Sequence, residues 1–445
     1  MKKGFILITL LISIPIVGFS QPVHWAVDST AAWIEAVNGI RGSGNDRTHI
    51  VTVTGAVSVP PVVNENIFGN VTGITVTMEG NGSFALSSNG TLLNIGNQQT
   101  LVINDIALRG HAGNNSRLVV VNRGGTLQMK GNASISGNTA EQYTDLFRRP
   151  SVRGVGGGVL VYYGTFIMQD SASVYNNTSS HSGGGVLVGG TFIMQDNASV
   201  SGNTSLNVIA GGGGGVSAAG TFIMQDNASV TGNTATGGGG GGGGVLFRTG
   251  TFTMQDNSSI SGNRSLQTAS LGGGADGGGV RVAGGTLTIT GNASISGNTS
   301  VRGDGGGVFV QGILVMQENT LISGNTARTG GGVHVYANVG RGTFNMLSGT
   351  IAGNYAEVGG GVYVSRGGWA GDTEGVFTKP GGTIYGNNAE VHLRNTASFR
   401  NRGSAIFFGT TIFVGPFLDS ATGNWRNATA GPAMNPSTFG FWLND

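Results

Sequence analysis

The chain reads GGGVLVGGTFIMQDNASVSGNT at positions 183–204 and GGGGGVSAAGTFIMQDNASVTGNT at positions 211–234. About eight copies of this phrase occur, each beginning with a Val after a run of glycines and ending with an Asn. The offset from Val to Asn is 17 or 18 residues in the first six copies, then 21 and 25. The offset from each Asn to the next Val varies between 8 and 17. Short apolar runs that recur in this way predict a solenoid, with the constant part as scaffold and the variable part as loop. The marker valines are Val159, Val186, Val216, Val245, Val280, Val308, Val333 and Val362, and the closing asparagines are Asn177, Asn203, Asn233, Asn263, Asn298, Asn325, Asn354 and Asn387.

Alternation within the phrase predicts three short strands per turn. Two Val positions stay apolar while the position between them is mixed, and this period of two is typical of a strand. A Phe-x-Met segment and a segment with one Ile or Val complete the turn. We expect these apolar residues to face the core and the mixed column to face outward. That mixed column is Leu160, Leu187, Ser217, Leu246, Arg281, Phe309, His334 and Tyr363.

Three strands per turn, separated by Gly and Asn bends, favour an all-β fold, the parallel β-helix. A coil of this kind buries its apolar face only against the coils above and below it. With less regular strand material before the copies, we expect about 11 to 13 coils over residues 49–388. The closing Asn of each copy is predicted to turn inward and to form a stacked amide ladder, with an exposed turn as the alternative.

Both ends of such a solenoid need a cover, because the terminal strands have open edges. Asp28-Ser29-Thr30 precedes a segment with Trp33, Val37 and Ile40 on one helical face, which predicts a short capping helix within residues 21–48. The repeat is lost in residues 389–445, and we expect this segment to form the other cap or a tail. Its large apolar residues are Trp425, Phe439, Phe441 and Trp442.

Residues 1–20 have the layout of a secretory signal peptide, with Lys2 and Lys3, an apolar stretch at 5–17 and small residues before position 21. We expect a mature chain from about Gln21 without a transmembrane span; a retained anchor is the alternative. The chain has no cysteine, which excludes disulfides and a cysteine-linked lipid. The formal charge falls from +2 to 0 without the two lysines, and no basic stripe indicates a nucleic-acid partner. The pattern predicts a bacterial protein that is secreted or held at the cell surface or outer membrane.

An acidic column follows the Phe-x-Met segment: Asp170, Asp196, Asp226 and Asp256. Stacked carboxylates repel one another unless they are solvated or bridged by a cation, and clustered oxygen ligands suit calcium. Flanking copies have Gly131 and Gly291 at this position, which favours a bend in which Asp forms a turn. The interpretation is therefore a turn, with calcium binding left open, and no cofactor or metal site is assigned.

One irregular patch has the residue types of a catalytic site. Arg281, Asp276, Arg302, Asp304 and His334 lie in neighbouring copies, where they could converge on adjacent coils. Acids near a base suit the chemistry of a polysaccharide lyase or hydrolase. Scattered surface charge is the alternative that the sequence favours, so no catalytic residue is assigned.

The GGGV and Val/Ile-Ser-Gly-Asn motifs, from Leu127 to Asn388, resemble the GGA(I/L/V) and FxxN repeats of chlamydial polymorphic outer membrane proteins. They are also similar to glycine-rich β-helix repeat proteins exported by spirochaetes. The resemblance implies a right-handed, pectin-lyase-like parallel β-helix at the cell surface, often in adhesion. The chain departs from that pattern in having Ile or Val for the Phe of FxxN, and no segment long enough for an autotransporter barrel follows the repeats.

Two functions follow from these observations. The first is a non-catalytic surface or secreted protein that binds an unidentified protein or glycan through its loops and an outward strand face. The longest loops are predicted at 139–155 and 264–275, and the apolar members of the mixed column would form the face. The second is a carbohydrate-active enzyme, which would gather acids and a base on one face of the solenoid.

Overall fold

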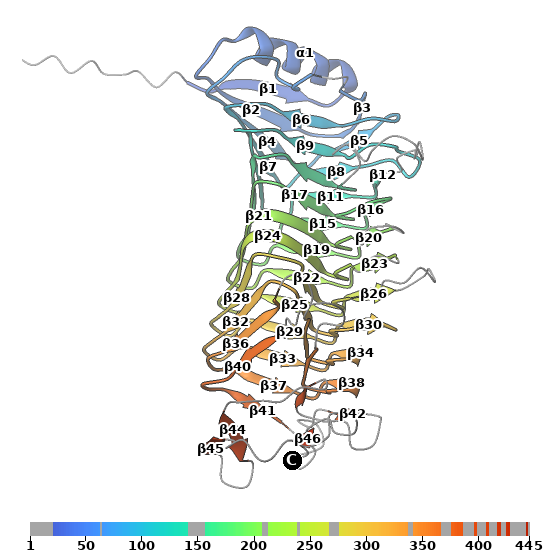
Figure 1. Ribbon diagram of the computed structural model, residues 1–445. Coiled ribbons are helices and arrows are strands. Elements are labelled where there is room, and N and C mark those ends of the chain that lie inside the picture. Colours follow the sequence, from blue (N-terminus) through green and yellow to red (C-terminus); the bar gives the residue numbers. More distant parts are fainter. Residues whose placement is uncertain are drawn as a thin grey trace, which may run out of the picture.

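The computed structural model is all-β apart from α1 (Thr30–Gly42) in the part of the chain that it describes. It describes residues 21–62, 65–140, 156–206, 212–237, 241–266, 276–336, 341–365 and 375–385, and beyond these only the backbone of a few short strands. Parallel sheets stack into a β-solenoid of about 11 turns, capped by α1 at one end (Figure 1). The predicted all-β parallel solenoid is confirmed.

Each turn of the repeat region has four strand positions. The Val-x-Val strands are β9 (Val119–Val121), β13 (Val159–Val161), β17 (Val186–Val188), β27 (Val280–Val282), β31 (Val308–Val310), β35 (Val333–Val335) and β39 (Val362–Val364). The Phe-x-Met strands are β10 (Thr126–Lys130), β14 (Thr165–Met168), β18 (Thr191–Met194), β28 (Thr286–Ile289), β32 (Ile313–Met316), β36 (Thr343–Met346) and β40 (Val376–Thr378). In two turns these positions are continuous, as β21 (Val216–Met224) and β24 (Val245–Met254).

The remaining positions form two further sheets of 12 and 9 strands. The Ile/Val strands are β11 (Ser134–Ser136), β15 (Ser173–Tyr175), β19 (Ser199–Ser201), β22 (Ser229–Thr231), β25 (Ser259–Ser261), β29 (Ser294–Ser296), β33 (Leu321–Ser323), β37 (Thr350–Ala352) and β41 (Thr383–Ile384). The fourth strands are β12 (Thr139–Ala140), β16 (Thr178–Ser179), β20 (Thr204–Ser205), β23 (Thr234–Thr236), β26 (Arg264–Leu266), β30 (Thr299–Val301), β34 (Thr326–Thr329), β38 (Tyr355–Val358) and β42 (Thr396–Ala397).

Less regular turns precede and follow the repeats. The first strands are β1 (Val23–Val27), β2 (Thr48–Val53), β3 (Ala56–Val59), β4 (Ile74–Gly80), β5 (Ser83–Leu86), β6 (Leu93–Ile95), β7 (Gln99–Asn104) and β8 (Ala107–Arg109). The last are β43 (Ile406–Phe408), β44 (Pro416–Asp419), β45 (Asn424–Asn427) and β46 (Trp442–Leu443). The predicted C-terminal cap lies for the most part outside the described residues.

The fourth strand was not predicted. The repeat pattern predicts three strands per turn and a loop after each closing Asn, and this prediction is wrong at the start of that loop. Instead, residues such as Thr204 and Ser205 pair with Thr234 and Ala235 in the next turn. These strands are only two to four residues long, too short for a period of two to be visible. In Figure 1 they form a separate column along one side of the solenoid.

The core is built from identical residues stacked in register. Val186 pairs with Val216 and Phe192 with Phe222, and the Val, Phe, Met and Ile/Val positions of the repeats are buried with few exceptions. The rings of Phe166, Phe192, Phe222 and Phe252 stack at centroid distances of 4.9, 5.0 and 4.4 Å. Each buried Phe contributes about 2 kcal/mol of apolar burial, but only when the neighbouring turns are present.

The asparagine ladder is confirmed. Asn233 is fully buried, and its Oδ1 accepts a hydrogen bond from the backbone N–H of Asn203 (2.9 Å) and another from the Asn203 Nδ2 (3.0 Å). Its own Nδ2 donates to Asn263 Oδ1 and to the backbone carbonyl of Val200, both at 3.0 Å. The same backbone-to-Oδ1 bond links every turn from Asn138 to Asn354, while Asn387 lies outside the described residues.

The N-terminal cap is also as predicted. The Ser29 hydroxyl accepts a hydrogen bond from the Ala32 N–H, and the helix buries Trp33, Val37 and Ile40. The Trp33 ring lies 4.7 Å from the ring of Phe84 in β5, so the helix covers the first turns directly.

Candidate functional site

The mixed outer column is not an exposed face, which corrects the sequence-based expectation. Its side chains point away from the core, yet Leu246 and Phe309 are each only 2% exposed. The fourth-strand layer covers them, because the chain doubles back after the closing Asn. In two turns the residue four positions before the marker Val contacts the outer column: Thr329 contacts His334, and Asp276 contacts Arg281.

The outer column and the fourth-strand layer that covers it enclose a second interior. The residue types in this second interior change along the solenoid. In the turns that start at Val186, Val216 and Val245, the covering position is a serine or glycine and the outer column is leucine or serine. In the next three turns, the covering positions are Asp276, Asp304 and Thr329, aligned by parallel bridges. Opposite them, the outer column becomes Arg281, Phe309 and His334. Because the preceding turns form the same scaffold without these residues, folding alone does not require them.

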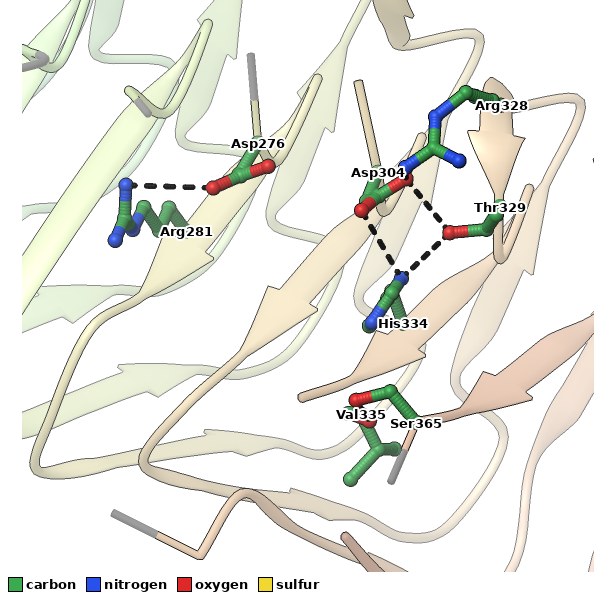
Figure 2. A network of polar contacts seen from close by, with 8 residues as sticks. All are labelled: Asp276, Arg281, Asp304, Arg328, Thr329, His334, Val335 and Ser365. Carbon is green, nitrogen blue, oxygen red and sulfur yellow. Dashed lines mark hydrogen bonds and ion pairs between the residues drawn. The ribbon is translucent and has the colours of Figure 1, made fainter. Parts of the chain in front are cut away.

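The network around His334 has one carboxylate at its centre (Figure 2). Asp304 Oδ1 accepts hydrogen bonds from Arg328 Nη2 (2.8 Å) and from the Thr329 hydroxyl (2.7 Å). The Thr329 Oγ1 lies 2.8 Å from His334 Nδ1. Since the single hydroxyl proton of Thr329 goes to Asp304, His334 Nδ1–H donates to Thr329 and Nε2 carries the lone pair. That Nε2 is buried and has no hydrogen-bond partner.

Arg281 and Asp276 form the second half of the network. Arg281 Nη1 lies 3.6 Å from Asp276 Oδ2, Arg281 Nη2 donates to Gln311 Oε1 at 2.9 Å, and the guanidinium lies 5.5 Å from the centroid of the Phe309 ring. Both charged side chains are only about 15% exposed. The free energy lost by removing such a pair of charges from water is about as large as the free energy gained from their attraction.

Burial shifts the pKa values of these groups in characteristic directions. It raises the pKa of Asp276 to about 7, a shift that neighbouring Asp304 increases and Arg281 opposes. It lowers the pKa of His334 to about 4, although Asp304 favours the protonated form. Desolvation also lowers the pKa of Arg281. At neutral pH, His334 is therefore uncharged and donates only from Nδ1–H, and Asp276 holds a proton part of the time.

The structure brings together Asp276, Arg281, Asp304 and His334 of the predicted patch, while no hydrogen bond or ion pair joins Arg302 to them in the described part of the chain. Arg302 instead occupies a turn with φ 61°. Arg328, Thr329 and Gln311 also belong to this network, although the repeat pattern does not indicate them. Aligning the chain backwards from each marker Val would have placed Asp276, Asp304 and Thr329 in one column.

The acidic column forms turns, as the sequence favoured. Asp170, Asp196, Asp226 and Asp256 have φ between 54 and 56°, the left-handed conformation that Asp tolerates. Each carboxylate accepts the backbone N–H of the preceding turn, as Asp226 Oδ2 does from Asp196 at 3.0 Å. Within the described ranges, no group of three His, Asp or Glu residues is placed to hold a metal ion.

Neither the known family models, nor the curated proteins, nor the solved structures include a match to this chain. The resemblance to chlamydial and spirochaete repeat proteins therefore stays a prediction. None of the helices in the described residues is long and apolar enough to cross a membrane.

Proposed function

We propose that this β-solenoid is exported, from about Gln21, and that it binds a surface protein or glycan without chemical turnover. The predicted signal peptide and the rigid stacked scaffold support this proposal. The observation that carries it is the change of the outer column from leucine to charged and aromatic residues in three consecutive turns. A buried polar network lowers the stability of the fold, whereas turns of the same scaffold with leucine in the outer column avoid this loss. The network is therefore better explained by function than by folding.

The earlier turns of the solenoid show which residues can replace the polar network in a test of this proposal. A variant with Asp276→Gly, Arg281→Leu, Asp304→Gly and His334→Leu copies the residues that earlier turns have at these positions, such as Gly241 and Leu246. Its solenoid should fold with an unchanged or higher Tm, because apolar residues replace a buried ionic network. Both mature proteins would be screened against arrays of glycans and matrix proteins. The proposal predicts binding by the wild type that the variant loses; equal binding by the two would place the site elsewhere.

A second candidate function is polysaccharide hydrolysis. Asp276 and Asp304 lie on adjacent strand positions, and burial keeps a proton on Asp276 near neutral pH while Arg328 and Thr329 bond Asp304. A glycosidase uses a pair of carboxyl groups, one of which holds a proton and acts as the general acid. Release of reducing ends from a polysaccharide by the wild type, but not by Asp304→Asn, would replace the binding proposal with this one.

A further inference from the structure

The bends that join the Val-x-Val strands to the Phe-x-Met strands form a line along the solenoid, which we call the bend strip. In the described residues it comprises 122–124, 162–164, 189–190, 219–220, 248–250, 283–285, 311–312, 336 and 341–342. Backbone hydrogen bonds tie the strip to the strands of the preceding turn, from Tyr162 N to Val121 O at the end of β9 and from Tyr336 N to Val310 O at the end of β31. The strip is therefore a continuous surface feature with the spacing of the strands.

Charge is segregated between this strip and the bend on the other side of the Phe-x-Met strands. The bend strip contains Arg123, Arg248 and Arg341, all exposed, and no acidic residue in its described positions. The opposite bend contains the acidic column together with Asp105 and Glu318. None of the three strip arginines forms an ion pair with a described acid; Arg248 donates instead to the Ser182 hydroxyl at 3.2 Å.

Two adjacent tyrosines stand on the strip, in a bend that in the other described turns begins with Gly, Ala, Asn, Arg, Gln or, at 336, another Tyr. Tyr162 and Tyr163 are 47% and 58% exposed, and their rings meet edge to face at 4.9 Å. The Arg123 guanidinium lies 5.8 Å from the Tyr163 ring. Tyr163 has φ 54°, a conformation that is costly for a bulky residue. The next two turns have shorter bends of two residues, 189–190 and 219–220, so the solenoid also turns at this point without tyrosine.

The spacing of these groups indicates the size of the ligand. Four strand spacings separate the turns of Arg123 and Arg248, and three separate those of Arg248 and Arg341, which amounts to about 19 and 14 Å at ~4.8 Å per strand. These distances are between backbone positions; the Arg248 guanidinium itself reaches back to Ser182, and burial together with the charge of Arg281 lowers the pKa of Arg248. Three charges over this length are far too sparse for a nucleic acid, which has a charge every ~1.7 Å.

We infer that the bend strip binds a linear acidic polysaccharide that runs parallel to the solenoid axis. The arginines match carboxylate or sulfate groups in charge and hydrogen-bond geometry. The tyrosines offer apolar ring faces for sugar rings, together with a hydroxyl for hydrogen bonding. A protein partner would need a contiguous apolar centre, whereas the strip between its arginines and tyrosines is mainly glycine and alanine. This inference rests on the proposed binding function and adds the chemistry of the ligand, but it places the ligand on the exposed bend strip and not on the buried network.

The test uses the mature chain, with polygalacturonate and chondroitin sulfate as acidic probes and dextran as the neutral probe. At low salt, the wild type should bind the acidic probes and not dextran, and binding should weaken as salt rises. The triple variant Arg123→Gln, Arg248→Gln, Arg341→Gln should lose at least tenfold in affinity. Tyr162→Gly with Tyr163→Gly should also weaken binding while raising Tm, because glycine relieves the positive φ.

Arg264→Gln is the matched control, since Arg264 is an exposed arginine on the fourth-strand sheet, away from the strip. A loss for Arg264→Gln equal to the loss for Arg248→Gln would show unspecific charge attraction and overturn the inference. Equal binding to dextran, or a triple variant that binds like the wild type, would also overturn it. If array binding to another ligand persists in the triple variant, the inference fails while the proposed function stands; if the wild type binds nothing, both fail.

Discussion

At the scale of single residues, one side chain per turn satisfies several buried backbone groups. The closing Asn accepts from the turn before it and donates to the turn after it, so each ladder member depends on both neighbours. Such charge-free hydrogen bonds contribute modestly when made, but their loss leaves buried donors and acceptors without partners.

Asn233→Ala should therefore lower the free energy of unfolding by about 2–4 kcal/mol, because it leaves the Asn203 N–H and the Val200 carbonyl without their partner. The exposed Asn227 provides the control, since its Nδ2 bonds only Asn197 Oδ1 at 3.2 Å among side chains. Asn227→Ala should cost less than about 0.5 kcal/mol. Urea unfolding of the two variants checks this; equal losses would contradict a structural role for the buried ladder.

Two residues of the polar network titrate in opposite senses. The pKa of His334 is about 4 in the fold and 6.5 ordinarily, so its contribution to stability is complete above pH 6.5 and is lost as pH falls toward 4. The pKa of Asp276 is about 7 against 3.8, so its contribution is complete below pH 3.8 and is lost as pH rises through 7. Between pH 4 and 6.5 the effects of the two groups on the free energy of unfolding change in opposite directions with pH, so they cancel in the wild type.

When either group is removed, the free energy of unfolding should change with pH as the remaining group alone dictates, by about 1.4 kcal/mol per pH unit. Relative to the wild type, His334→Leu should lose stability as pH rises from 4.5 to 6, whereas Asp276→Gly should gain it. Urea unfolding at several pH values measures both slopes. Identical pH profiles for the two variants would refute the opposed titration.

At the scale of elements, the glycine runs that lead into the Val-x-Val strands are tightly packed against neighbouring backbone and are not free loops. A Cβ at Gly184 would lie 2.2 Å from the Gly214 carbonyl oxygen and 2.5 Å from that of Thr204. The run therefore passes between two turns at a distance that only glycine allows. This packing places the fourth strand against the outer column, and so makes the second interior.

Gly184→Ala should destabilise the protein by about 1–3 kcal/mol, because backbone on both sides must move. Gly42→Ala at the end of α1 is the control, since its Cβ would meet nothing within 4 Å and alanine favours a helix. Thermal unfolding should separate the two variants clearly. A Gly184→Ala protein as stable as the wild type would mean that the run is not tightly packed.

At the scale of the whole molecule, the solenoid depends on its ends. Each turn contacts mainly its neighbours, so the first turn has an open edge unless β1 and α1 cover it. In the described residues β1 pairs with β2, and α1 lies across this end (Figure 1).

A chain that begins at residue 48 should associate through the exposed edge of β2. Size-exclusion chromatography with light scattering would show oligomers whose fraction grows with concentration. The matched control is a chain that begins at Gln21 and retains the cap. A stable monomer without β1 and α1 would show that the cap is dispensable.

Much of the scaffold could be predicted from the sequence. The Val, Phe, Met and Ile/Val columns, the Asn ladder and the Asp turns follow from comparing the copies of the phrase with one another, and the capping helix follows from the local pattern around Ser29 and Trp33. The fourth strand could not be predicted, because two residues such as Thr204 and Ser205 have no period.

The sequence by itself determined the coil, since the residues that face the core are set by alternation over a few positions. Only the tertiary structure decided what covers the outer column. Asp276 and Arg281 are close along the chain, but Asp304, Thr329 and His334 meet because strands from different turns stack in register across loops of unequal length. The bend strip has the same origin, since Arg123, Tyr163 and Arg248 share one line only after the turns have stacked.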